Sequence, residues 1–400
     1  MTSTGEDSII VAGAGHVGLI AALALAKSGR DVLSLGMLPD PSSDRRTTAL
    51  MMPAIRFLHR VGLWEALEPH AAPMTSMRIL DGTRRLVRSP SVTFQASEIG
   101  EPAFGYNIAN GKLTAVLGDA LQQSTARNIG ISVSRYHPAE AVISVEASDG
   151  SMFPASMVVA ADGRASPARE AAGISTRRWN YDQTALVLSF NHTREHHDTS
   201  TEFHTEHGPF TQVPLKGKSS SLVWVTKPEM AAELLELSPE QLAARVEERM
   251  QSMLGAVEIV SGPQSWPLSG LVPNAFARNR VFLAGEAAHV FPPIGAQGLN
   301  LGIRDVEALL EVLPDHGSDL GAAEVVSAYN RKRSLDILAR TGAVDALNRS
   351  LLSDFIPVQM VRSGGLELLR AFSPLRSFIM REGLRPGSGF RLPGREASQR

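Results

Sequence analysis

Residues 8–27 read SIIVAGAGHVGLIAALALAK. The first five residues are apolar apart from one serine, which is the pattern of a short buried strand. Three glycines follow within six positions, and the alanine- and leucine-rich run after them predicts a helix over residues 19–27. Residues 31–35 (DVLSL) predict the next strand. This strand–helix–strand order predicts the first unit of a doubly wound α/β domain.

The three glycines, Gly13, Gly15 and Gly18, have the spacing of a dinucleotide-binding fingerprint. They allow a tight turn, close approach of the backbone to a pyrophosphate, and close packing of helix on strand. An acidic residue usually follows the second strand and binds the ribose, but Gly36 stands there. Either Asp40 replaces it or backbone groups suffice. The chain holds one such fingerprint, so we expect one nucleotide to be bound durably and any second to visit a less specialised groove.

The composition of the 400 residues excludes several classes of protein. Of these residues 43% are hydrophobic, which is ordinary for a globular protein, and the net charge of −2 argues against nucleic acid as a partner. The chain has no cysteine, which excludes disulfides, thiolate nucleophiles and iron–sulfur clusters. The apolar run at residues 17–26 follows Glu6 and Asp7 without a basic residue, unlike a secretory signal. We therefore expect a cytoplasmic protein.

Two more apolar runs, residues 157–161 and 281–284, predict further strands of the same sheet, each followed by an acid next to a glycine. These pairs are Asp162-Gly163 and Gly285-Glu286. A helix with one apolar face is predicted to begin near residue 298, with Asp305 outside that face. Between these segments lie β-rich stretches typical of a second domain.

The predicted fold is thus α/β, a doubly wound nucleotide-binding domain interleaved with a β-sheet domain and followed by C-terminal helices. The nucleotide-binding domain is predicted to be discontinuous, over residues 1–73, 101–175 and 278–345. The sheet domain is predicted over residues 74–100 and 176–277, and a helical region over residues 346–400.

Residues 281–305 read VFLAGEAAHVFPPIGAQGLNLGIRD. This segment resembles the class A flavoprotein aromatic hydroxylases, and in detail their ubiquinone-biosynthesis branch. In that family the strand ends in Gly-Asp, whose acid binds the ribityl chain of FAD, and a Pro-Pro-x-x-x-Gln-Gly-x-Asn loop lies against the isoalloxazine ring. Glu286 replaces the acid here, with the same acceptor oxygens on a side chain one methylene longer. The resemblance implies FAD contacts from Gly285, Glu286, Pro292, Gly295, Gln297, Gly298, Leu299 and Asn300. It implies catalytic positions at Pro293, Gly298 and Asn300.

Two other segments carry the same resemblance. The run from Asp162 and Gly163 resembles the family motif whose acid contacts FAD and whose surroundings are associated with the reduced pyridine nucleotide. The run from Arg46 resembles the segment that lays an arginine near the flavin. A weaker match near residue 104 has Gly111 where the family usually has arginine. Together the matches cover roughly residues 8–350.

The resemblance implies an FAD-dependent monooxygenase that uses NAD(P)H and O2 to hydroxylate an aromatic ring through a flavin C4a-hydroperoxide. The implied substrate is a prenylated phenol of ubiquinone biosynthesis. A glycine-rich loop at a helix N-terminus suits this chemistry, because its N–H groups favour an anionic reduced flavin. Two alternatives stay open. One is a hydroxylase of small soluble aromatic compounds, and the other is a non-catalytic scaffold in a biosynthetic complex, supported only by Gly36 and Glu286.

Five of the eleven histidines fall within residues 192–207. Their spacing fits no standard ligand set, so we expect no metal site and interpret these histidines as solvated strand ends. His289, next to the predicted flavin loop, is expected to be a structural histidine rather than a proton-transfer group.

The segment from Gln359 to the C-terminus is basic, with eight arginines and three glutamates, a local charge of +5. Ser373 and Pro374 predict the start of a helix that presents Leu375, Phe378 and Ile379 on one side. This helix is expected either to dock on its own domain or to contact a membrane surface or a partner in a biosynthetic complex.

Overall fold

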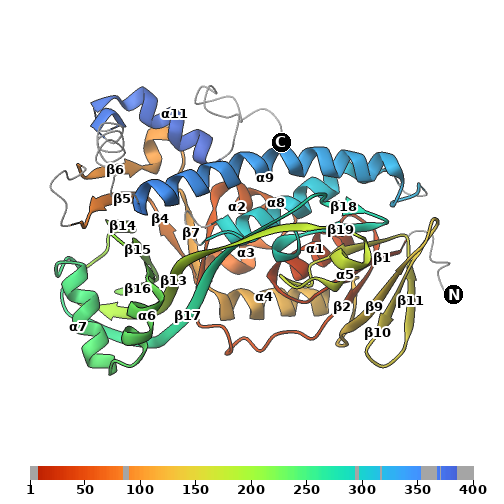
Figure 1. Cartoon of the computed structure of the whole chain (residues 1–400), viewed down its shortest axis with the longest axis horizontal. Helices are drawn as coiled ribbons and strands as arrows, with labels where there is room; N and C mark the ends of the chain where they lie inside the picture. The colour runs from red at the N-terminus through yellow and green to blue at the C-terminus, as the bar shows by residue number, and fades with distance from the viewer. Residues whose placement is uncertain are drawn as a thin grey trace.

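The computed structural model describes residues 8–83, 90–292, 297–315, 318–352, 367–369 and 371–384, with the backbone alone for residues 338–352 and 384. Its strands form four sheets, and the two largest have six and seven strands. Figure 1 shows these two sheets at opposite ends of the molecule, with a small sheet between them.

The six-stranded sheet has the doubly wound arrangement that the sequence predicts. Its central strand β1 pairs in parallel with β2 on one side and with β12 on the other, and β12 pairs in parallel with β19. The chain therefore reverses its direction of travel across the sheet beside β1, and such a reversal opens a crevice at the carboxyl ends of the strands. In spatial order the strands are β18 (Ala277–Arg278), β19 (Val281–Leu283), β12 (Met157–Ala160), β1 (Ser8–Ala12), β2 (Asp31–Leu35) and β8 (Arg127–Ile129).

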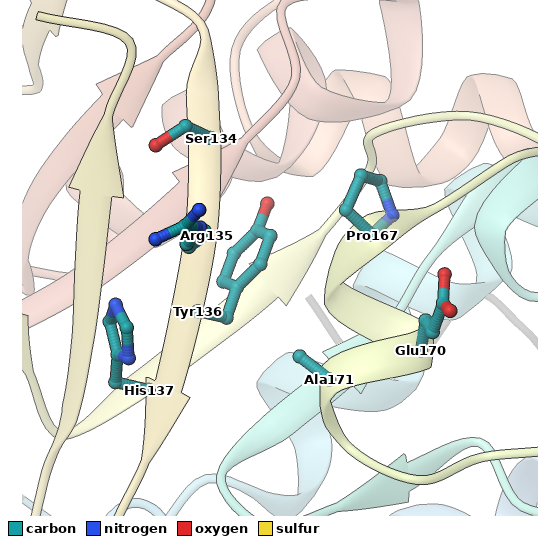
Figure 2. Close-up of a pocket in the computed structure, with 7 residues that line it drawn as sticks. All are labelled: Ser134, Arg135, Tyr136, His137, Pro167, Glu170 and Ala171. Carbon is teal, nitrogen blue, oxygen red and sulfur yellow. The ribbon is translucent and has the colours of Figure 1, made fainter.

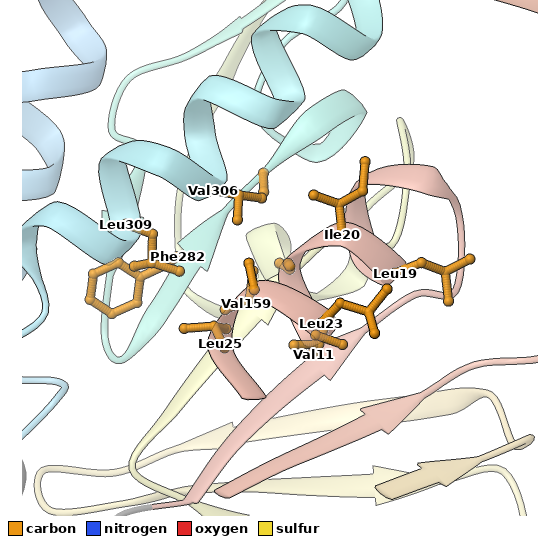
Figure 3. Packing of buried hydrophobic residues seen from close by; sticks show 14 of the residues in the cluster. Val11, Leu19, Ile20, Leu23, Leu25, Val159, Phe282, Val306 and Leu309 are labelled. Carbon is orange, nitrogen blue, oxygen red and sulfur yellow. The ribbon is translucent and has the colours of Figure 1, made fainter. Parts of the chain in front are cut away.

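Helix α1 (His16–Lys27) is buried on nearly all sides, because β1 and β2 cover one face and α4 (Asn110–Gln123) and α8 (Gln297–Val312) flank the others. Small residues allow this close packing: an ideal Cβ on Gly302 of α8 would lie 2.4 Å from Val17 Cγ2. Figure 3 shows Ile20 of α1 on the side of the helix that faces Val306 of α8.

The buried face of α8 differs from the prediction in one residue. Ile303, Val306 and Leu309 are buried as expected, but Asp305 is also fully buried. Helical periodicity predicts that a charged residue lies on the solvent face of a helix. Asp305 is buried instead because three hydrogen bonds to its carboxylate offset the cost of removing it from water.

The seven-stranded sheet carries α6 (Pro228–Leu235) and α7 (Pro239–Arg249) on one face, over a core that includes Phe190, Phe210 and Trp224. Its two longest strands, β13 and β17, run as an antiparallel pair from this sheet towards the six-stranded sheet (Figure 1). In spatial order the strands are β17 (Val257–Pro273), β13 (Thr176–His192), β16 (Ser219–Thr226), β15 (Gly208–Pro214), β14 (Thr199–Thr205), β5 (Ser76–Asp81) and β6 (Val92–Gln95).

Two three-stranded sheets and several short helices complete this part of the chain. The sheets are β3 (Thr47–Met51), β7 (Gly105–Ala109) and β4 (Ala71–Met74), and β11 (Met152–Ala155), β10 (Ile143–Ala147) and β9 (Val133–Pro138). The helices are α2 (Met52–Arg60), α3 (Trp64–Leu67), α5 (Pro167–Ala171), and the short 3-10 turns η1 (Glu68–His70), η2 (Ala96–Ile99) and η3 (Gly285–Ala287).

The C-terminal part consists of helices. The long helix α9 (Ala323–Leu352) spans the molecule from the six-stranded sheet towards the seven-stranded one, and it continues through the predicted boundary at residue 345 (Figure 1). Helix α11 (Ser373–Leu384) packs on η2 through buried Met380 and an Arg376–Glu98 ion pair of 2.6 Å. Ile379 of this helix is 43% exposed. Among the described helices, none is both long and apolar enough to cross a membrane.

Candidate functional site

The carboxyl ends of β1, β12 and β19 lie side by side and bring three predicted motifs together. Gly13 follows β1, Asp162 follows β12 and Gly285 follows β19. An ideal Cβ on Gly13 would lie 2.2 Å from the carbonyl oxygen of Ala161, so the first two motifs are in direct backbone contact. The motifs thus meet at the crevice where an α/β sheet binds its ligand.

Each fingerprint glycine has a different role in the packing. Gly13 has φ +105°, which a side chain rarely adopts, and a Cβ on Gly18 would lie 1.9 Å from the Gly13 carbonyl oxygen. Gly15 differs from both, because it is exposed and a Cβ there would have no atom within 4 Å. The space in front of Gly15, at the uncapped N-terminus of α1, is therefore open to an anion.

Asp162 presents an unpaired buried oxygen at this crevice. Its Oδ2 accepts hydrogen bonds from the Ala168 N–H at 3.1 Å and the Tyr136 hydroxyl at 3.4 Å. Its Oδ1 is buried without a hydrogen-bond partner among the described residues. Burial raises the pKa of Asp162 against the hydrogen bonds that lower it. A buried acceptor without a partner is costly, so a ligand donor at Oδ1 would stabilise the site.

Arg169 joins the second motif to the third. It is 3% exposed, and its guanidinium donates to the carbonyl oxygens of Arg164 and Ala287, each at 2.8 Å. Glu286, beside Ala287, points outward with a 61% exposed side chain, and its nearest cation is Arg164 at 4.0 Å. The backbone of this edge is therefore held rigidly while the Glu286 carboxylate stays free to turn to a ligand.

Arg46 lies at the rim of the same region. Its guanidinium forms a two-pronged ion pair with Asp44, at 2.7 and 2.8 Å, and stacks 4.7 Å above the ring of Trp266 on β17. Hydrogen bonding to Asp44 and the nearby Glu286 raise the pKa of Arg46. For Asp44, burial favours the neutral carboxyl, but hydrogen bonds from Arg46 and Asn110 outweigh burial and lower the pKa to about 2.

The loop that holds Asp44 also explains why Gly111 departs from the family pattern. An ideal Cβ on Gly111 would lie 2.3 Å from the carbonyl oxygen of Pro41. The loop therefore fills the space that an arginine side chain at residue 111 would need, and Asn110 ties α4 to the loop by donating to Asp44 at 2.8 Å.

The absent acid at Gly36 also has a structural reason. Gly36 has φ +155°, and a Cβ there would lie 2.8 Å from the Ala14 nitrogen. Asp40 accepts hydrogen bonds from the backbone and hydroxyl of Ser42, at 2.9 and 2.7 Å. Because Asp40 is engaged within its own turn, the structure favours backbone groups over Asp40 as ribose partners.

The N-terminal turn of α8 begins at Gln297, with Gly298 exposed and Leu299 half-buried. Asn300 accepts a hydrogen bond from the Met51 N–H and donates to the Ala49 carbonyl, both at 2.8 Å. Asn300 thus joins α8 to β3. Of the two prolines before this turn Pro292 is buried, while Pro293 and Gly295 lie outside the described residues.

A buried ionic network supports the Gly285 edge from behind. Asp305 accepts hydrogen bonds from the Gly285 N–H and His289 Nε2, both at 2.8 Å, and from Arg333 Nε at 2.7 Å. Burial disfavours the charge on Arg333, but Asp305, Tyr329 and other neighbours outweigh it and raise its pKa. His289 is 2% exposed, a position that suits the structural role expected for it. Arg333 was missed by the sequence analysis, since 28 residues separate it from Asp305 and no local pattern links them.

A groove of about 270 Å³ lies between β9 and α5, next to Asp162. Figure 2 shows the ring of Tyr136 between the strand and the helix. Burial and the neighbouring Asp162 raise the pKa of Tyr136, so its hydroxyl remains a donor. The groove touches the site through this hydroxyl.

These features define a protein that binds a dinucleotide at the switch point of a doubly wound sheet. The open space at Gly15 accommodates a pyrophosphate and the unpaired Asp162 Oδ1 accommodates a hydroxyl donor, so the residues present fit FAD. A model of the FAD binding domain family matches residues 6–339, and the chain belongs to this family.

Relatives that match nearly the whole chain support this assignment. The ubiquinone hydroxylase UbiL of Rhodospirillum rubrum is 32% identical over 388 residues, which cover 94% of this chain and 89% of that protein. The 3-demethoxyubiquinol 3-hydroxylase of Escherichia coli is 27% identical over 370 residues, which cover 90% of this chain and 93% of that protein. The predicted resemblance to the class A flavoprotein hydroxylases and their ubiquinone branch is confirmed, and with it an FAD-dependent monooxygenase that uses NAD(P)H.

Solved structures show the same fold. The p-nitrophenol 4-monooxygenase PnpA of Pseudomonas putida matches with a TM-score of 0.77 at 22% identity, over 97% of this chain and 99% of that one. HpxO of Klebsiella pneumoniae, solved with FAD and uric acid, matches with a TM-score of 0.74 at 18% identity, over 96% and 97%.

Because Gly15 and Gly18 have different surroundings, we expect substitutions at these two positions to have different effects. We expect Gly15→Val to fold normally but to lose bound FAD, since its side chain fills the open space at α1. We expect Gly18→Val to destabilise the fold itself, because its Cβ meets the Gly13 carbonyl. Flavin absorbance per protein and thermal unfolding of the apoprotein separate the two effects. Normal flavin content in Gly15→Val would contradict the assignment.

The Asp305 network predicts a large loss of stability. Arg333→Met leaves the Asp305 carboxylate fully buried with one ionic partner fewer, and breaking such a pair costs about 3–5 kcal/mol of unfolding free energy. Urea unfolding of the apoprotein measures this loss. The double variant Arg333→Met with Asp305→Asn is expected to lose less than the sum of the single variants. Strict additivity would show that the two residues act independently.

Proposed function

We propose that this protein hydroxylates the aromatic ring of a prenylated phenol on the route to ubiquinone, with NAD(P)H and O2 as co-substrates. The observation that carries the proposal is the similarity to UbiL of Rhodospirillum rubrum along 94% of the chain, together with a crevice whose residues fit FAD. The neighbours of known structure are below 25% identical, so they support the fold and do not favour a small soluble substrate.

The proposed FAD site is built from the three motifs. In this proposal the backbone around Gly13, Gly15 and Gly18 binds the pyrophosphate at the N-terminus of α1. Asp162 Oδ1, beside Gly163, accepts a hydrogen bond from the cofactor. The remaining proposed contacts are Arg46, Gly285, Glu286, Pro292, Gln297, Gly298, Leu299 and Asn300, with Pro293 and Gly295 added from the sequence.

Bound FAD supplies the electron transfer from NAD(P)H to O2 and the transfer of one oxygen atom to the ring. The protein orients the reactants and excludes water. In this proposal the N-terminal turn of α8, with its partial positive charge, stabilises negative charge on the reduced ring system. Asn300 holds that turn in place through its two hydrogen bonds to β3. The proposed catalytic residues are then Pro293, Gly298 and Asn300.

The domain division predicted from the sequence is part of the proposal. Residues 1–73, 101–175 and 278–345 would bind FAD, and residues 74–100 and 176–277 would cover the substrate. The substrate sheet is tied to β3 by a hydrogen bond of 2.8 Å between the hydroxyls of Thr47 and Ser221. In this proposal the two domains together enclose the reacting atoms and exclude water from them.

We further propose that the C-terminal segment contacts a membrane surface rich in anionic lipid. Leu368 and Phe372, four residues apart on one helix face, are each 53% exposed, and Ile379 is 43% exposed. The segment from Gln359 also carries a charge of +5. Exposed apolar side chains beside basic residues favour an anionic bilayer, in which a prenylated substrate resides.

Oxygen labelling tests the reaction. With ¹⁸O2 and a prenylated phenol, we expect the label in the ring hydroxyl of the product. Label that arrives from water, or turnover that continues without O2, would overturn the monooxygenase assignment. In Asn300→Ala, α8 loses its attachment to β3, so we expect released H2O2 to rise more than NAD(P)H oxidation falls. Asn330→Ala is the matched control, because Asn330 bonds in the same way to the backbone of Ala277, at the β18 edge of the sheet.

Vesicle flotation tests the membrane contact. We expect the full chain to float with vesicles that contain phosphatidylglycerol, and Leu368→Ser with Phe372→Ser to remain behind with unchanged flavin content. Binding is expected to weaken in 1 M salt, where charges are screened within about 3 Å. Equal flotation of wild type and double variant, or equal binding to neutral vesicles, would contradict the proposal.

A further inference from the structure

Three of the five histidines in the segment 192–207 are buried, contrary to the prediction, whereas His197 is exposed. His192, His196 and His204 are 5%, 9% and 5% exposed, which corrects the interpretation as solvated strand ends. His192 and His196 each have a ring nitrogen within hydrogen-bond distance of a backbone carbonyl, at 2.7 and 2.8 Å. His204 differs from both, because its partner is a carboxylate.

His204 and Glu202 form a pair on β14. His204 Nε2 lies 3.0 Å from Glu202 Oε1, and Glu202 Oε2 accepts a hydrogen bond from the Thr211 hydroxyl at 3.3 Å. A carboxylate accepts hydrogen bonds and does not donate them, so Nε2 carries the proton. In the tautomer that carries its proton on Nε2, Nδ1 is an acceptor, and Nδ1 makes no hydrogen bond with a described residue.

The pair lies on the face of the sheet opposite α6 and α7. Residues two apart on a strand share a face, so Glu202 and His204 point away from Phe203, which packs in the helix-covered core. Thr211, Val213 and Ser221 share the face of the pair through the strand register.

The same face meets the proposed flavin site. Ser221 accepts hydrogen bonds from the Thr47 hydroxyl at 2.8 Å and from Asn107 at 3.1 Å. Thr47 begins β3, the strand that Asn300 binds. Glu202 lies two strands across and two residues along from Ser221, a separation of about 12 Å by ordinary strand geometry. His204 lies on the same face, two residues further along β14 from the level of Ser221 than Glu202.

One more acid faces His204. Asp81 of β5 is its direct neighbour across the parallel pair β5–β14, and Asp81 Oδ1 accepts hydrogen bonds from the Thr83 N–H and hydroxyl. Arg78 of β5 pairs with Thr201 and lies on the opposite face, where it contacts Met253. On β14, β15 and β5, the ionisable groups on this face are thus Glu202, Asp81 and His204 itself. Two carboxylates therefore lie beside the ring of His204 on this face.

We propose that His204, oriented by Glu202, accepts the proton of the phenolic hydroxyl of the aromatic substrate. This inference rests on the proposed hydroxylase function. The O–H bond breaks, its electron pair stays on the oxygen, and the proton binds His204 Nδ1. The phenolate then shares its negative charge with the ring, which makes the ring carbons more reactive towards an electrophilic oxygen. No electron leaves the substrate in this step, and the imidazolium returns the proton to the product.

Two measurements test the proposal on the FAD-loaded protein. The first is the visible spectrum of bound 4-nitrophenol against pH, because its ionised form is coloured. We expect wild type to bind the phenolate at a pH where free nitrophenol is neutral, and His204→Gln to bind the neutral form. The second is the rate of ring hydroxylation of a prenylated phenol. We expect a loss of about 100-fold or more in His204→Gln at neutral pH, as for a general base, with recovery as the pH rises.

Three variants sharpen the interpretation. Glu202→Gln keeps a side chain of the same shape without the charge, and it is expected to lose less than His204→Gln. Thr211→Val removes the second contact to Glu202 and is expected to have a small effect. His192→Gln makes the same change on the opposite face of the sheet and is expected to leave the colour of bound nitrophenol unchanged.

The outcomes separate this inference from the function on which it rests. Nitrophenol bound in the same ionisation state by wild type and His204→Gln, or a rate deficit that does not shrink as the pH rises, would overturn the role of His204. Either result would leave ¹⁸O2 incorporation by wild type intact. Label from water in wild type would instead overturn the hydroxylase function itself.

Discussion

The buried carboxylate of Asp305 fixes the part of the fold on which the proposed cofactor site depends. It accepts hydrogen bonds from the backbone of Gly285, from His289 and from Arg333, so one side chain joins the end of β19, α8 and α9. A fully buried carboxylate is stable only with all of its donors in place. The end of β19, where cofactor chemistry is proposed, is therefore held in position because the buried Asp305 carboxylate needs the Gly285 N–H as a donor.

The crevice in front of this network differs from it in how its polar groups are paired. Behind the crevice both oxygens of Asp305 are paired. At the crevice, in contrast, Gly15 faces open space and Asp162 Oδ1 has no partner among the described residues. Arg169 lies between the two regions and binds the backbone of both loops. This arrangement keeps a ligand site prepared without collapse of the loops into it.

Local sequence patterns were sufficient to predict strands such as β1 and β2, but they were insufficient to predict the buried ionic contacts. The bounds predicted for β1 and β2 agree with the structure, because alternation of short apolar runs and glycine depends on neighbours in sequence. The burial of Asp305 was predicted wrongly, since its partner Arg333 lies on another helix. Gly36 and Gly111 depart from the family pattern in sequence, and the structure shows each packed against backbone where a side chain has no room. The Glu202–His204 spacing was visible in the sequence, but its meaning depends on which face of the seven-stranded sheet meets β3.

Strand β3 is the element through which the two halves of the proposed reaction site communicate. At its start Thr47 bonds to Ser221 of the seven-stranded sheet, and at its end Ala49 and Met51 bond to Asn300 of α8. A displacement of β3 would therefore move the face that carries His204 and the helix turn proposed to lie at the flavin at the same time. Because these links are hydrogen bonds with directional geometry, they fix orientation more strongly than apolar packing would. One short strand thus links the sheet that carries the proposed base His204 to the helix turn proposed to lie at the flavin.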